Sequence, residues 1–149
     1  MQPLVFLLFV AVINFGVCQQ PTCDPGWEQH EGYCYYYGGA AVSYGEAMAI
    51  CRAQGSLAEI PTLGINDFLT PIARRHGDSC VWVGGTDILI EGVFQWASGA
   101  NAFNFTNWGN GEPSHNNGQD CLQLFRDYNY KWDDTVCTKN CYFFCEQPF

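Results

Sequence analysis

Residues 132–146 read WDDTVCTKNCYFFCE, in which two adjacent carboxylates precede three cysteines spaced four residues apart. On a helix, Cys137, Cys141 and Cys145 would share one face, an arrangement that could hold zinc. The segment is instead rich in aromatic residues and lacks a run of helix-favouring residues. We therefore expect strands here, and cysteines that form disulfides.

The first 18 residues favour the same interpretation because they predict an oxidising compartment. MQPLVFLLFVAVINFGVC combines an uncharged apolar run with small residues near its end, the outline of a secretory signal peptide without the usual Lys or Arg. The run is short for a transmembrane helix, with a signal anchor as the alternative, and no later segment is suited to membrane insertion. We expect residues 1–18 to be a signal peptide and residues 19–149 to form one secreted, extracellular domain. Removal of Cys18 leaves eight cysteines, an even number that indicates disulfides without saying which residues pair.

The charge balance limits the partners. The formal net charge is −9, with six Lys and Arg in total, so nucleic acid and anionic membrane surfaces are poor partners. Between residues 87 and 134, only Arg126 and Lys131 oppose seven carboxylates: Asp87, Glu91, Glu112, Asp120, Asp127, Asp133 and Asp134. A solvated acidic surface and a divalent-cation site, which collects carboxylates, both explain this excess.

Local patterns place a hairpin and two helices in the first half of the chain. Residues 21–38 alternate aromatic and polar side chains around two cysteines, which predicts a hairpin. Residues 43–55 predict an amphipathic helix, because a Ser and a Glu stand in capping-box spacing and a glycine ends the segment. The face that this helix would bury contains Ala47, Ile50 and Cys51. Residues 64–77 predict a second helix, which Pro71 would break or restart.

Strands dominate the second half of the chain. They are predicted at residues 80–85, 92–99, 120–125, 130–137 and 142–149. Residues 97–120 are rich in Gly and Asn and show no periodicity, which predicts a long loop of the kind that is usually functional or disordered. Helices that precede strands, rather than alternate with them, predict an α+β fold.

Several motifs together resemble the C-type lectin-like domain family. In chain order they are WVGG at 82–85, TDILIEGVFQW at 86–96, EPS at 112–114, WDD at 132–134 and FFCE at 143–146. The resemblance covers residues 23–146 and rests on the order of the motifs and cysteines rather than on any single motif. It implies an α+β C-type lectin-like fold with two helices, small antiparallel sheets and a long calcium-binding loop region, stabilised by disulfides.

The resemblance also implies a disulfide pattern. The implied pairs are Cys51–Cys145 across the whole domain, Cys121–Cys137 beside the loop, and Cys23–Cys34 in the N-terminal hairpin. With these three assigned, Cys80 and Cys141 remain as a fourth pair, outside the family's common set. In the chain-entropy model, closing a loop of about 95 residues contributes about 4–5 kcal/mol, support that a small secreted domain with a long loop needs.

In the resembling lectins, calcium is held by the first and third residues of the EPS-type tripeptide, an acid before the loop's cysteine and the pair after the tryptophan. Carried over by position, the implied ligands are Glu112, Ser114, Gln119, Asp133 and Asp134. Ser114 stands where Asn or Asp is usual, Gln119 replaces Glu, and Asp133 replaces Asn. The charge lost at one position is regained at another, so three carboxylates remain, and we interpret the set as a calcium (Ca²⁺) site kept in altered form.

The resemblance implies that a sugar binds this calcium through two neighbouring hydroxyl groups, which also contact Glu112, Ser114, Gln119 and Asp133. Glu112 can only accept hydrogen bonds whereas Ser114 can donate or accept, which is closer to mannose-type than to galactose-type recognition. At the other two positions, Gln119 offers a hydrogen-bond donor where the family has an acceptor, and Asp133 offers an acceptor where the family has a donor. We therefore expect mannose-type sugars to be only slightly preferred over galactose-type sugars. The family also holds the bond before Pro113 cis, whereas an ordinary turn proline would be trans.

Five further residues are candidates for a second metal site, a modification or a sugar contact. Asp87, Glu91 and Asp120 match acidic positions of an auxiliary calcium site in some family members, although the first two could instead cap turns. Asn104 begins an N-glycosylation acceptor sequence, and its phenylalanine neighbours would leave it facing outward. Trp108 borders the loop and is either a sugar-stacking ring or part of the core, the place expected for Trp82, Trp96 and Trp132.

The leading functional hypothesis is a secreted, calcium-dependent lectin for glycans on cell or microbial surfaces, a role that fits innate immunity. An extracellular matrix or biomineral-associated structural protein is the alternative. The sequence shows no sign of a raised-pKa acid facing a second carboxylate across a cleft, so an enzyme is not expected. A single exposed binding loop implies weak affinity per site, which homo-oligomers would raise through avidity, although no coiled-coil or collagen-like segment is present.

Overall fold

The computed structural model describes residues 22–99, 102–114 and 118–149. The expected signal peptide lies outside these residues, so its cleavage stays a prediction. Within the described part of the chain, no helix has the length and apolarity needed to cross a membrane.

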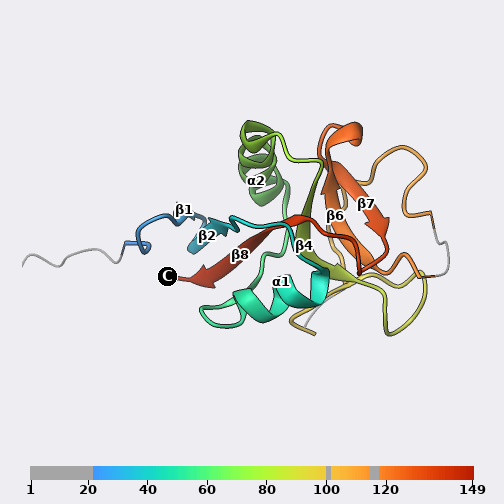
Figure 1. Cartoon of the computed structure of the whole chain (residues 1–149), viewed down its shortest axis with the longest axis horizontal. Helices are drawn as coiled ribbons and strands as arrows, with labels where there is room; N and C mark the ends of the chain where they lie inside the picture. Colours follow the sequence, from blue (N-terminus) through green and yellow to red (C-terminus); the bar gives the residue numbers. More distant parts are fainter. Residues whose placement is uncertain (1–21, 100–101, 115–117) are drawn as a thin grey trace, which may run out of the picture.

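Among the described residues, eight strands form the framework of the domain (Figure 1). They are β1 (Glu28–His30), β2 (Tyr33–Tyr37), β3 (Ser56–Leu57), β4 (Cys80–Thr86), β5 (Gln95–Trp96), β6 (Cys121–Phe125), β7 (Lys131–Thr135) and β8 (Tyr142–Pro148). The main path runs β1-β2-β8-β4-β6-β7, with β3 paired to β8 and β5 paired to β4. The expected α+β fold is confirmed, but its sheets are not all antiparallel, because β4 and β8 pair in parallel at Val81–Tyr142 and Trp82–Phe143. Of the strand expected at residues 92–99, only β5 forms.

The middle of the sheet is the most deeply buried part. All residues of β4 except Thr86 are buried, which is why WVGG reads as a continuous apolar run rather than an alternating one. Gly85 is needed for close packing, because a Cβ at this position would lie 2.5 Å from a Leu122 methyl carbon and 2.7 Å from the Phe103 ring. The loop residue Phe103 can therefore press directly against the sheet.

Helix α1 (Tyr44–Cys51) begins as its sequence predicts. The Ser43 hydroxyl accepts from the Glu46 amide while the Glu46 carboxylate accepts from the Ser43 amide, which completes the capping box. The buried face contains Tyr44, Ala47 and Cys51. Ile50 was expected on this face but is 47% exposed, because one residue from Cys51 corresponds to about 100° of rotation around the helix.

Helix α2 (Leu63–His76) is continuous, so the prediction that Pro71 would break or restart it is wrong. An interior proline costs roughly 3 kcal/mol by removing one hydrogen bond and crowding the preceding turn. Burial compensates for this cost, since each fully buried aliphatic side chain contributes about 1.5–3 kcal/mol. The buried hydrophobic residues of α2 are Ile65, Leu69, Ile72 and Ala73. Gly77 then ends the helix at a φ of 76°, in the left-handed region that glycine adopts without strain.

In the part of the chain that the structure describes, four disulfides hold the elements together: Cys23–Cys34, Cys51–Cys145, Cys80–Cys141 and Cys121–Cys137. The pattern agrees with the pairs that the resemblance implied, including the fourth pair outside the common set. Trp82, Trp96 and Trp132 are fully buried, as expected of core residues.

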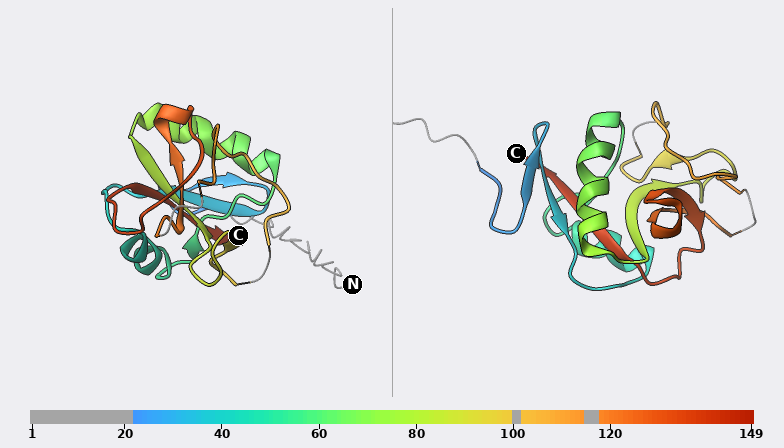
Figure 2. Two further views of the ribbon diagram at one scale, coloured as in Figure 1. Left: turned by 90° about the vertical axis from the view of Figure 1, so that its right-hand side faces the viewer. Right: turned by 90° about the horizontal axis from the view of Figure 1, so that it is seen from above.

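The helices, the C-terminus and the loop region lie in different parts of the molecule. α1 and α2 lie on opposite sides of the strands β2 and β8 (Figures 1 and 2). The C-terminus lies beside the β1–β2 hairpin, where the Phe149 amide donates to the Gly32 carbonyl at 3.2 Å. The segments between β4 and β6 gather at the other end, next to β6 and β7 (Figure 1).

Candidate metal and ligand site

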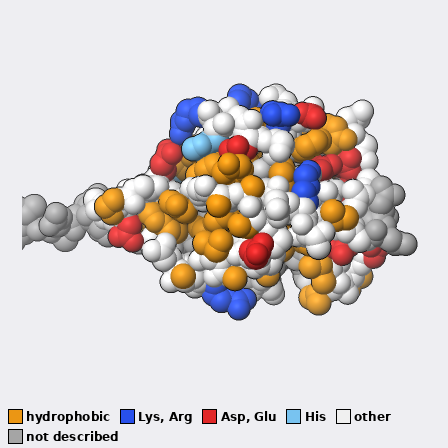
Figure 3. Space-filling view, in the orientation of Figure 1, with side chains coloured by type: hydrophobic (Ala, Val, Ile, Leu, Met, Phe, Trp, Pro, Cys, Tyr) orange, Lys and Arg blue, Asp and Glu red, His pale blue; other side chains and the backbone are white. Residues whose placement is uncertain are grey.

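Three carboxylates converge where the loop meets β7. Glu112 comes from the loop, and Asp133 and Asp134 come from adjacent positions of β7. Each offers one oxygen, and these oxygens all lie within 4.8 Å of one another. Figure 3 shows carboxylate side chains at this end of the molecule, among others spread over the same face. The sequence separates Glu112 from the Asp pair by about twenty residues, so the cluster exists only in the folded chain.

Backbone hydrogen bonds fix the loop to β7. The Gly109 amide donates to the Trp132 carbonyl at 2.8 Å, and the Trp132 amide donates to the Asn107 carbonyl at 2.9 Å. The Glu112–Pro113 peptide bond is cis, as the resemblance implied. The tripeptide is therefore held beside the strand that carries the two aspartates.

Ser114 and Gln119 form hydrogen bonds with the same cluster. The Ser114 amide donates to Asp134 Oδ1 at 2.8 Å, and the Ser114 hydroxyl donates to Gln119 Oε1 at 2.8 Å. Gln119 Nε2 in turn donates to the Asp134 carbonyl oxygen at 3.3 Å. A glutamate at position 119 could not make this last bond, because an ionised carboxylate only accepts. The structure thus brings all five residues of the implied ligand set together.

Asp133 has partners that sequence reasoning missed. Gln123, which faces Asp133 across the β6–β7 pair, is 1% exposed and donates from Nε2 to Asp133 Oδ2. Lys139 Nζ donates to Gln123 Oε1 at 3.1 Å and lies 4.9 Å from the centre of the Phe125 ring. The amide of Gln123 therefore links a partly buried cation to the carboxylate. A signal was present in the sequence, since Gln123 is the one polar residue between Cys121 and Phe125.

The electrostatics of the cluster indicate uncompensated negative charge. Burial, followed by the neighbouring Asp134, raises the pKa of Glu112 to about 7, against the opposing effect of the hydrogen bond from Tyr128. Burial also raises the pKa of Asp133, and the bond from Gln123 opposes this. Glu112 Oε2 is buried and has no hydrogen-bond partner among the described residues. A buried carboxylate oxygen without a donor fits a position that a cation would satisfy.

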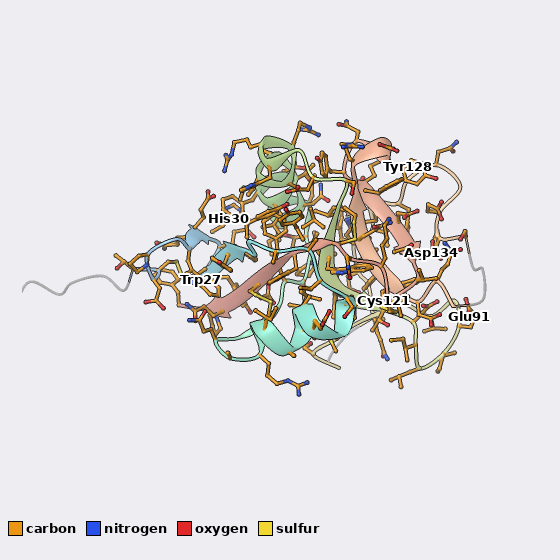
Figure 4. All side chains as sticks on the ribbon, in the orientation of Figure 1. Trp27, His30, Glu91, Cys121, Tyr128 and Asp134 are labelled. Carbon is orange, nitrogen blue, oxygen red and sulfur yellow. A yellow bond between two sulfur atoms is a disulfide. The ribbon has the colours of Figure 1, made fainter. Side chains whose placement is uncertain are left out.

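The auxiliary set is not brought together in the same way. Within the described ranges, Glu112, Asp133 and Asp134 form the one group whose oxygens meet the 4.8 Å distance. Asp87 is 2% exposed and accepts from the Gly92 amide at 2.8 Å, which matches the turn-capping alternative. Glu91 is exposed, and it lies near the right-hand edge in Figure 4, below the label of Asp134.

Two other expected residues have clear positions. Asn104 is exposed between the half-buried Phe103 and Phe105, so its side chain is accessible to a glycosylation enzyme. Trp108 is half-buried, and its ring lies 5.6 Å from that of Trp132 and 4.9 Å from that of Phe94. It therefore packs at the edge of the core while keeping part of its surface open.

Comparison with known proteins identifies relatives over most of the chain. Residues 40–147 match the family described as "Lectin C-type domain". The chain is 36% identical over 129 residues to "Perlucin" from Haliotis laevigata, covering 84% of this chain and 83% of that protein. It is 30% identical over 151 residues to "Lectin BRA-3" from Megabalanus rosa, covering 99% of this chain and 90% of that protein.

The solved structure of human lithostathine has the same fold. It superposes with a TM-score of 0.78 at 26% identity, covering 85% of this chain and all of that chain. The agreement extends the likeness from sequence to three-dimensional structure.

Proposed function

This chain belongs to the lectin C-type domain family, and from that premise we propose that it is a secreted, calcium-dependent lectin that recognises neighbouring hydroxyl groups of terminal sugars. Membership of the family makes it a binding protein rather than an enzyme. The observation that carries the proposal is the convergence of Glu112, Asp133 and Asp134, together with the buried, unpartnered oxygen of Glu112.

The residues present suit calcium. Calcium prefers six to eight oxygen ligands from carboxylates, carbonyls and water, and supplies a positive charge to which sugar hydroxyls bind directly. Glu112, Asp133 and Asp134 would provide the charged oxygens, and the Ser114 hydroxyl and Gln119 carbonyl would provide neutral ones. The existing bonds of Ser114 and Gln119 to Asp134 and to each other keep these oxygens close to the carboxylates.

Sugar recognition would use the same side chains. Glu112 can accept a hydrogen bond from one sugar hydroxyl, and Ser114 can donate or accept at the other. Gln119 uses one of its two N–H donors on the Asp134 carbonyl, and its oxygen accepts from the Ser114 hydroxyl. The tripeptide supports a mannose-type preference over a galactose-type one, because its first residue, Glu112, can only accept hydrogen bonds.

A melting experiment tests the metal part of the proposal. A ligand that binds only the folded state raises the melting temperature, so millimolar calcium is expected to stabilise the protein relative to chelator. Glu112→Gln should abolish this stabilisation and calcium-dependent sugar binding while the fold is retained. Asp127→Asn removes the same charge from an exposed position and should behave as the wild type. An unchanged midpoint with calcium for the wild type would reject the metal site and the lectin function with it.

A glycan array tests the sugar part. Binding to mannose-bearing glycans is expected with calcium and not with chelator, ahead of galactose-bearing glycans. Ser114→Asn, which gives the mannose-type tripeptide, should preserve or strengthen this binding. A shift of that variant toward galactose would overturn the sugar assignment but leave the metal site intact.

The setting of this function is extracellular. Four disulfides are typical of proteins that fold in an oxidising compartment, and the exposed Asn104 would carry a glycan there. Glycans on cell or microbial surfaces are the proposed partners, in a role related to innate immunity. Because a single site of this kind binds weakly, several copies acting together would supply avidity.

A matrix or biomineral-associated role is the second candidate, favoured by the net charge of −9 and the carboxylate cluster. The two functions differ in what releases the protein. Free sugar in the presence of calcium should elute a lectin from its target, whereas a protein held on a mineral by its carboxylates would stay bound until calcium is chelated.

A further inference from the structure

The central residue of the tripeptide, Pro113, forms part of the lining of an apolar groove. The groove has a volume of about 280 Å³ and is walled mainly by Val93, Phe94, Phe103, Thr106, Trp108 and Pro113. Pro113 stands between Glu112 and Ser114 in the tripeptide. One residue therefore links the groove to the two implied calcium ligands on either side of it.

The lining of the groove suits a group without hydroxyls. Among the described residues that form it, none is charged, and Thr106 supplies the one side-chain hydroxyl. A second sugar ring would bring several hydroxyl groups into this space, and those that face the apolar walls would lose water, with the Thr106 hydroxyl as the one side-chain partner of the lining. Binding an aliphatic chain has no such cost, and it removes apolar surface from water on both sides.

The walls are preformed and partly open to solvent. Phe94 is 8% exposed, and its ring meets the ring of Trp108 edge-to-face at 4.9 Å. The Phe103 ring lies 5.8 Å from that of Phe94 and 6.3 Å from that of Trp108. Val93, by contrast, is 51% exposed and forms part of the rim. An occupant could thus enter over Val93 without any rearrangement of the aromatic side chains.

Resting on the lectin function proposed above, we propose that this groove binds an alkyl or acyl chain attached to the sugar that the Glu112 cluster holds. Pro113 lines the groove and is bonded to Glu112 and Ser114, so the two ligand parts would lie near each other. The ligand class is therefore a glycoconjugate with an aliphatic aglycone close to its terminal sugar. The volume is close to the lower end of the range for small-molecule pockets, roughly 300 Å³, which is enough for a short chain.

Alkyl glycosides test the proposal on the intact protein. Calorimetry would compare methyl and octyl α-mannoside, and the matched galactosides, below the micelle concentration, with calcium and with chelator. The octyl glycoside is expected to bind at least tenfold more tightly than the methyl glycoside of the same sugar. Tenfold corresponds to about 1.4 kcal/mol, which the burial of about two methylene groups supplies.

Variants locate the effect in the groove. Val93→Ser should lower octyl affinity severalfold and leave methyl affinity unchanged, because only the aglycone contacts the rim. Ile90→Ser is the matched control, since Ile90 is 63% exposed in the same loop but does not line the groove. Ala102→Phe, at an exposed lining position, should block the octyl chain by filling space. Thr106 stays unchanged in all variants, because replacing it would also remove the glycosylation sequence.

The outcomes separate this inference from the function on which it rests. Equal affinities for octyl and methyl glycosides, with calcium-dependent binding of both, overturn the aglycone site and leave the lectin standing. Loss of all glycoside binding overturns both. Octyl binding that survives the chelator overturns the link between groove and sugar site. A dimer in sedimentation experiments that Val93→Ser dissociates overturns the proposed occupant in favour of a second copy of the chain.

Discussion

Tyr128 donates a hydrogen bond to Glu112 Oε1 at 3.1 Å, so the short 3-10 helix between β6 and β7 (Arg126–Tyr128) holds a side chain of the loop. The close approach depends on Gly109, where a Cβ would lie 2.6 Å from the Tyr128 ring. The candidate ligand is thus oriented by a residue that belongs to neither the tripeptide nor the Asp pair.

Tyr128→Phe should weaken calcium binding and change its pH dependence. The hydrogen bond from Tyr128 lowers the pKa of Glu112, which burial raises to about 7. Without it the pKa of Glu112 rises further, so protons compete with calcium up to a higher pH. The loss of a bond worth about 0.5–1.5 kcal/mol predicts a several-fold weaker affinity at pH 7. Calcium titrations between pH 6 and 9 would measure this, with Tyr33→Phe as the control at the opposite end. If calcium affinity depended on pH in the same way for Tyr128→Phe and the wild type, Tyr128 would not lower the pKa of Glu112.

Gln123→Met should destabilise the fold more than its small change in volume suggests. Its side chain satisfies both Asp133 and Lys139, and each buried group left without a partner costs about 1–3 kcal/mol. In a double-mutant cycle measured by urea denaturation, adding Lys139→Met should cost less than the two single changes together. Strict additivity would show that Gln123 does not couple the lysine to the carboxylate.

Glu146→Gln should stabilise the protein at high pH. Burial raises the pKa of Glu146 to about 8, the charge of Glu59 adds to this effect, and hydrogen bonds to the carboxylate oppose it. The residue is 8% exposed. The folded state therefore keeps a proton that the unfolded chain releases near its ordinary pKa of 4.5. The free energy of unfolding that this proton contributes is fully present below pH 4.5. It falls as the pH rises from 4.5 and is lost once the pH has passed 8.

Urea denaturation at pH 5 and pH 9 would measure this effect. The variant should exceed the wild type by a few kcal/mol at pH 9, and the gap should shrink toward pH 5. Glu91→Gln, an exposed site, is the control and should show little difference at either pH, with chelator present throughout. A constant gap at both pH values would argue against a protonated Glu146.

The Cys80–Cys141 disulfide should contribute more stability than Cys23–Cys34. The two bonds span 61 and 11 residues, for which the chain-entropy model gives about 4 and about 3 kcal/mol. Cys80 and Cys141 are also almost fully buried, so replacing both by alanine leaves a cavity. Urea denaturation of the two double-alanine variants would measure how much free energy of unfolding each disulfide contributes. A larger loss on removing Cys23–Cys34 would mean that this bond stabilises the N-terminal hairpin more than its loop length predicts.

Local features were the most predictable from sequence. The capping box at Ser43 and Glu46 and the β1–β2 hairpin formed as predicted, because short-range hydrogen bonds and turn geometry select them. The parallel pairing of β4 with β8 was not predicted, since it joins segments about sixty residues apart. Pro71 stayed inside α2 for a related reason, because burial against the rest of the core outweighed a local preference.

The candidate site also combines features that can be read from the sequence with features that depend on the tertiary structure. The sequence by itself determined which residue types are available: the eight cysteines of residues 19–149, the tripeptide at Glu112, and the Asp pair at residues 133 and 134. Only the tertiary structure decided that Glu112 Oε2 is buried without a donor, that Gln123 and Lys139 support Asp133, and that Pro113 lines an apolar groove. Burial and desolvation depend on contacts between distant segments, and the order of residues along the chain does not specify these contacts.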